Sequence, residues 1–84
     1  MNLSFDKILG RSEVAWGYIS ADYRQREILG SSFVLNFSGK RYQLRVSSVG
    51  RIVSKKLTRA LSATEGMRLT FTMEKKGQFA LRMS

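Results

Sequence analysis

Four basic side chains lie within nine residues near the middle of the chain and offer the clearest candidate chemistry. They are Arg51, Lys55, Lys56 and Arg59. The two lysines open a segment that we expect to be helical, at the end where the helix dipole disfavours cations. A phosphate bound there would meet both ammonium groups and the free backbone N–H groups of the first turn. The cluster therefore predicts a nucleic-acid contact. The alternative is that the two lysines are merely exposed and solvated.

The net charge of +9 lies entirely in the second half of the chain. Residues 1–38 hold four basic and four acidic side chains, whereas residues 39–84 hold eleven basic and two acidic ones. Such a one-sided field favours a polyanionic partner. Double-stranded DNA is the partner we expect first, with RNA and an acidic protein as the alternatives that charge leaves open. If the partner is an acidic protein, the chain would be an adaptor that docks this protein through the same basic surface.

Further cations and two aromatic residues extend the candidate surface. The cations are Arg24, Arg26, Lys40, Arg41 and Arg45, which we expect to broaden the positive field. Trp16 and Tyr18 flank Gly17 in a predicted strand, where Gly17 is expected to mark a bulge or tight bend, and we expect the two rings on opposite faces of that strand. Either ring could stack on a base, and the alternative is a large residue that covers one end of a barrel.

Composition argues against several classes of protein. The chain has no histidine and no cysteine, which removes the commonest general base, metal ligand and thiolate nucleophile. The six acidic residues are scattered, so we expect no enzyme, no metal and no cofactor. Neither a long apolar run nor a signal-peptide pattern is present. We therefore expect no membrane partner and a cytoplasmic protein.

Alternation and turn residues predict a mainly β domain with two short helices. Strands are predicted over 3–8, 14–20, 33–38, 41–47, 49–53, 67–73 and 79–83, helices over 21–29 and 55–61, and a loop over 10–12. Ser20 and Ser54 are the expected helix N-caps. Both helices are too short to be stable alone and must dock on the sheet. The expected aromatic core is Phe33, Phe37, Tyr42, Phe71 and Phe79.

Residues 14–47 and 49–84 read as two copies of one unit within a single domain, 1–84. The closing segments are Tyr-Gln-Leu-Arg-Val-Ser at 42–47 and Phe-Ala-Leu-Arg-Met-Ser at 79–84. The predicted order strand, helix, strand, strand occurs in both. A unit of this size cannot bury its own apolar face, so the two copies should share one core.

The second copy resembles the SpoVT/AbrB family. The likeness lies in Gly50-Arg51-Ile52-Val53 followed by a short helix, in the turn Glu65-Gly66, and in the final strand. The chain departs from the family at Ser54, where the family has a proline, and at Tyr18, which follows Gly17 in place of the arginine.

The resemblance implies a small closed β-barrel of the cradle-loop type with pseudo-two-fold symmetry, built from two copies in one chain. Swapped-hairpin, double-psi and RIFT barrels are not distinguished by these residues. The function it implies is a DNA-binding transcriptional regulator or antitoxin-like module. The chain could be a monomer or a homodimer.

Overall fold

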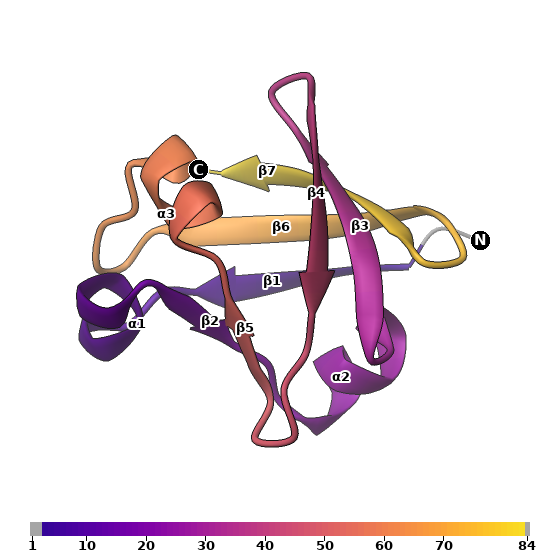
Figure 1. Cartoon of the computed structure of the whole chain (residues 1–84), viewed down its shortest axis with the longest axis horizontal. Coiled ribbons are helices and arrows are strands. Elements are labelled where there is room, and N and C mark those ends of the chain that lie inside the picture. Colours follow the sequence, from indigo (N-terminus) through magenta and orange to yellow (C-terminus); the bar gives the residue numbers. More distant parts are fainter. Residues whose placement is uncertain (1–2, 84) are drawn as a thin grey trace.

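The computed structural model describes residues 3–83 and is mainly β, as predicted (Figure 1). In chain order the elements are β1 (Ser4–Ile8), α1 (Arg11–Trp16), β2 (Tyr18–Ser20), α2 (Tyr23–Leu29), β3 (Ser32–Phe37), β4 (Lys40–Arg45), β5 (Arg51–Val53), α3 (Lys55–Leu61), β6 (Arg68–Lys75) and β7 (Gln78–Met83). Over this part of the chain no helix is long and apolar enough to cross a membrane.

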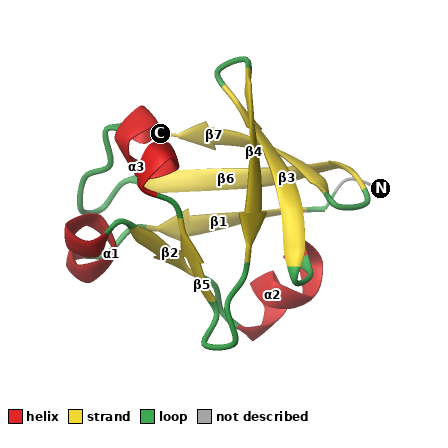
Figure 2. Cartoon of the chain, viewed as in Figure 1, coloured by secondary structure: helices red, strands yellow, loops and turns green. Residues whose placement is uncertain are grey.

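The strands form two sheets (Figure 2). The larger has five strands in the order β1-β6-β7-β3-β4, and the smaller pairs β2 with β5. Hairpins join β3 to β4 and β6 to β7, and β3 runs parallel to β7 at the centre of the larger sheet. The two hairpins thus meet through a pairing between segments more than 40 residues apart.

The order strand, helix, strand, strand occurs twice, as β2-α2-β3-β4 and as β5-α3-β6-β7. The first strands of the two units pair with each other, and Ile19 lies opposite Ile52. On either side of this pair, Tyr18 faces Val53 and Ser20 faces Arg51. Exchanging the two units leaves this register unchanged, which is the pairing expected across a pseudo-two-fold axis.

The predicted single closed barrel is not formed by the strands of residues 3–83, which pair into two separate sheets. In the two units β3 corresponds to β6 and β4 corresponds to β7. If the strand pairing were fully symmetric, the β7–β3 pair would therefore have a counterpart between β4 and β6. Instead β1, which precedes the first unit, pairs with β6 from Ser4 opposite Thr72 to Ile8 opposite Arg68. Among the described strands the larger sheet therefore ends at β1 and β4, and β4 keeps one edge without a strand partner there.

The predicted loop over 10–12 and the first part of the predicted strand over 14–20 are wrong, because α1 forms there. Glu13 accepts a hydrogen bond from the Gly10 N–H at 2.9 Å and so caps the first turn. Gly17, expected to mark a bulge, ends the helix with φ of +74° and donates its N–H to the Glu13 carbonyl. The described part of the chain thus has three helices rather than the expected two.

The two predicted helices are present. Helix α3 has the predicted bounds, and the Ser54 hydroxyl accepts a hydrogen bond from the Leu57 N–H at 3.2 Å. Helix α2 starts two residues later than predicted, because its N-cap is Asp22 and not Ser20. Asp22 and Gln25 form a reciprocal capping box with distances of 2.8 and 3.0 Å.

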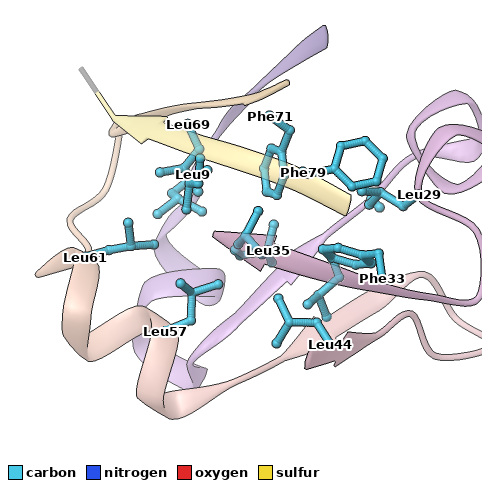
Figure 3. Packing of buried hydrophobic residues seen from close by; sticks show 14 residues of the cluster. Leu9, Leu29, Phe33, Leu35, Leu44, Leu57, Leu61, Leu69, Phe71 and Phe79 are labelled. Atoms are coloured by element: carbon cyan, nitrogen blue, oxygen red, sulfur yellow. The ribbon is translucent and has the colours of Figure 1, made fainter. Parts of the chain in front are cut away.

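The core lies between the larger sheet, the β2–β5 pair and α3 (Figure 3). Phe33, Phe71 and Phe79 are buried as predicted, whereas Phe37 and Tyr42 are only partly buried against the cluster. The rings of Phe33 and Phe79 meet edge to face with their centroids 5.7 Å apart. Leu57 and Leu61 of α3 are buried in the same cluster. Their burial holds one side of α3 against the sheets and leaves its other side to solvent.

Candidate nucleic-acid interface

Helix α3 displays the predicted basic cluster because its apolar side faces the core. Leu57 and Leu61 are one turn apart and buried, while Lys55, Lys56 and Arg59 are exposed. Arg51, the fourth member, is exposed on β5 directly before the helix. The short link through Ser54, whose side chain caps α3, fixes the position of the helix start relative to β5.

A first groove separates α3 from the start of β4 and has a volume of about 600 Å³. Lys56 and Arg59 line one side, and Lys40 and Arg41 line the other. Tyr42 and Ala60 complete it. Four of the predicted cations, from two segments distant in sequence, therefore face one concave surface. Like charges so close together raise the local positive potential and would attract an anion.

A second groove of about 780 Å³ lies between β4 and β5. Figure 1 shows these two strands running next to each other, joined by the loop that follows β4. They belong to different sheets and are not paired, which leaves the groove open between them. Arg45 and Arg51 are its cations, and Gln43, Ser47 and Ser54 are among the polar side chains that line it. Because Arg41 of the first groove and Gln43 of the second are two residues apart on the exposed face of β4, this groove adjoins the first.

A third, smaller hollow of about 360 Å³ is lined by Ser12, Trp16, Tyr18 and Arg51. We call these four residues the aromatic corner. The Arg51 guanidinium carbon lies 4.7 Å from the centroid of the Tyr18 ring, a cation–π contact. The prediction that Trp16 and Tyr18 point to opposite faces is wrong, because α1 ends between them and turns both toward the same hollow.

Six cations line these grooves and together form what we call the basic face. They are Lys40, Arg41, Arg45, Arg51, Lys56 and Arg59. The ion pairs found within residues 3–83 are Lys7–Glu13 at 3.2 Å and Arg11–Glu65 at 3.5 Å, and neither involves the basic face. No acidic side chain lines any of the three grooves. The positive charge there is therefore not offset by nearby protein groups.

The remaining predicted cations do not line the grooves. Arg24 is exposed on α2, and Arg26 is half-buried on the same helix. Arg26 packs against Gly50, where an added Cβ would lie 3.1 Å from its Nε. That buried Nε has no hydrogen-bond partner among residues 3–83. Lys55 lies beside the aromatic corner. Its Cγ would be 3.4 Å from a Cβ placed at Gly17, and Gly17 joins Trp16 to Tyr18.

The sequence prediction missed several polar residues that line the grooves, notably Ser12, Gln43 and Ser47. The alternation of β4 places Gln43 and Ser47 on the same predicted face as Arg41 and Arg45, so that signal was present. Ser12 could not be found in this way, because it was assigned to a loop. Within residues 3–83 no group of three potential metal-ligating side chains converges.

Comparison with known proteins gives a structural match without a named family. No protein-family model matches the chain, and no curated protein matches it at a significant level. The structure is similar to that of a hypothetical protein of Arabidopsis thaliana, with a TM-score of 0.73 and 12% sequence identity. The match covers 100% of this chain and 91% of the plant protein. At that identity the likeness concerns the fold.

Proposed function

We propose that this chain is a DNA-binding protein that holds double-stranded DNA against its basic face. The observation that carries the proposal is the convergence of six cations from β4, β5 and α3 on adjoining grooves without an acidic residue among them. A field of this kind is suited to a partner with regularly spaced negative charges. The SpoVT/AbrB-like role in transcriptional regulation stays a prediction, and the proposal does not depend on it.

The first contribution to binding at the basic face is electrostatic and comes from contacts between the cations and the phosphates. Each lysine or arginine that neutralises a phosphate releases counterions, so the logarithm of affinity falls by about 0.9 per contact and per decade of salt. Six contacts would give a slope of about −5. Arginines make two parallel hydrogen bonds to a phosphate, whereas a lysine acts as a point charge. The grooves hold both, so Arg41, Arg45, Arg51 and Arg59 would set the register of the backbone.

Polar side chains beside the cations supply groups that could read bases. Gln43 lies on β4 between Arg41 and Arg45, and Ser47 follows in the loop after the strand. Gln side chains can make paired hydrogen bonds to adenine, and serine hydroxyls can donate to several bases. Phosphate contacts by the flanking arginines would position these groups.

The test is the salt dependence of binding to random duplex DNA, measured by fluorescence anisotropy. Lys56→Ala with Arg59→Ala removes two cations from one side of the first groove. We expect the salt slope to become less steep by about 2. The matched control is Lys75→Ala with Lys76→Ala, two exposed cations at the turn of the β6–β7 hairpin, the end of the hairpin that lies away from α3 in Figure 1.

The control should keep a slope close to that of the parent protein. If both double variants lower the slope equally, binding is a general effect of net charge and the basic face is not the interface. Competition with duplex RNA and with an acidic polypeptide separates the other partners. Displacement of DNA by either at much lower concentration than by unlabelled DNA would contradict the choice of DNA.

A further inference from the structure

The aromatic corner has an exposed tryptophan that the fold itself does not use. Trp16 is 75% exposed at the end of α1, although tryptophan is usually largely buried. It belongs neither to the buried cluster nor to the partly buried residues packed against that cluster. A single exposed apolar side chain needs no explanation, but Trp16 shares its hollow with a second aromatic ring and a guanidinium group. The corner therefore needs an explanation beyond packing.

The other members of the corner define the kind of partner. The Arg51 guanidinium lies over the Tyr18 ring, so its planar group is already held in place. Trp16 lines the same hollow and offers a second planar surface, and Ser12 adds a hydroxyl at the rim. The Lys55 side chain runs beside Gly17, the residue that separates Trp16 from Tyr18 in the sequence. Planar surfaces combined with two cations fit a flat ring attached to a phosphate.

We propose that the aromatic corner binds an unpaired nucleobase, so that the protein favours DNA in which a duplex adjoins single-stranded nucleotides. This inference rests on the proposed function and names its substrate more closely. Arg51 lines both the aromatic corner and the groove between β4 and β5. A strand leaving a duplex on the basic face would reach the corner at Arg51. A base inside an intact duplex has both faces stacked and cannot use Trp16 as a platform.

The experiment compares a blunt duplex with the same duplex carrying a short single-stranded overhang. Both are labelled, and affinity is measured by anisotropy at one salt concentration. We expect the overhang to tighten binding by about fivefold or more, the effect of stacking one base on an aromatic side chain. Trp16 is the single tryptophan of the chain, so its fluorescence reports on the corner directly. The overhang should quench that fluorescence and the blunt duplex should not.

Variants assign the preference to this residue. Trp16→Ala should abolish the advantage of the overhang, and Trp16→Phe should keep part of it, because a smaller ring still stacks. Tyr23→Ala is the matched control, since Tyr23 is 69% exposed on α2, apart from α1 in Figure 1. It should leave the advantage unchanged. Because the Trp16 side chain is outside the core, its removal should not alter the unfolding midpoint, which is measured in parallel.

Three results would overturn the inference. Equal affinity for the two DNAs would show that no unpaired base is bound, even if the salt slope supports the basic face. An equal loss on both DNAs with Trp16→Ala would place Trp16 against the duplex instead. If neither DNA binds at low salt, the proposed function fails, and the inference fails with it.

Discussion

Gly50 is the position where a single added methyl group should have the largest effect on the loop between β4 and β5. Its φ is +79°, a conformation that side chains rarely adopt. A Cβ placed there would lie 2.8 Å from the Ala21 carbonyl oxygen and 3.1 Å from the Arg26 Nε. The Gly50 carbonyl also accepts a hydrogen bond from the Ala21 N–H at 2.7 Å. The backbones are thus held in contact, and the loop cannot move away without losing this bond.

Gly39, in the β3–β4 turn, supplies the matched control. Its φ is +78°, and a Cβ there would meet no atom within 4 Å. Gly39→Ala should therefore cost only the backbone strain, about 1–2 kcal/mol. Gly50→Ala should cost the same strain and in addition about 1–3 kcal/mol for forcing the two segments apart. The expected difference between the variants is thus about 1–3 kcal/mol in the free energy of unfolding.

The measurement is urea unfolding of both variants and the parent, followed by far-ultraviolet circular dichroism. The transitions should have the same slope with urea, so that the shift in midpoint reports stability. Equal destabilisation of the two variants would refute the reasoning, because it would show that the close approach of Gly50 to Ala21 and Arg26 is absent or easily relaxed. A larger loss at Gly39 would contradict it more strongly.

Two further predictions concern groups that position α1 and α3. Glu13→Ala should destabilise the fold by about 3 kcal/mol in thermal or urea unfolding, because the buried carboxylate accepts hydrogen bonds from Gly10 and Ser20 and its loss leaves the Lys7 ammonium group without its ion-pair partner. A loss below about 0.5 kcal/mol would show that these contacts do not form in solution. Ser54→Ala should cost about 1 kcal/mol by removing the N-cap of α3, and Ser54→Asp should restore most of it. Similar stability of the alanine and aspartate variants would contradict the capping role.

The segments that sequence analysis predicted best are those whose signal is local. Helix α3 follows a serine N-cap and carries leucines one turn apart, and its bounds agree with the prediction. The hairpins β3–β4 and β6–β7 follow alternating apolar residues joined by glycine-containing turns. Each of these patterns is encoded within a few residues, so no knowledge of the remaining chain was needed.

Helix α1 was missed because part of what stabilises it is not local: besides the local cap on the Gly10 N–H, the Glu13 carboxylate has partners in other elements. Residues 14–20 contain β-formers, which favoured a strand. The deciding group is Glu13, whose carboxylate is buried and also accepts from the Ser20 backbone N–H at 2.8 Å and pairs with Lys7 of β1. These partners come from other elements. A helical turn at this place is therefore a consequence of tertiary packing that outweighs local preference.

The sequence by itself determined that this protein is a small, mainly β, strongly basic chain with a cluster of cations around a short helix. It also indicated two units of the same element order, because composition and periodicity need no partner to be read. Only the tertiary structure decided that Lys40 and Arg41 face Lys56 and Arg59, and that Trp16 and Tyr18 share a hollow with Arg51. Those meetings depend on the pairing of β2 with β5 and of β3 with β7, which joins segments far apart in the chain. The distances between such segments depend on which apolar faces pack against one another. That packing involves all the elements of the core together and cannot be read from any one segment.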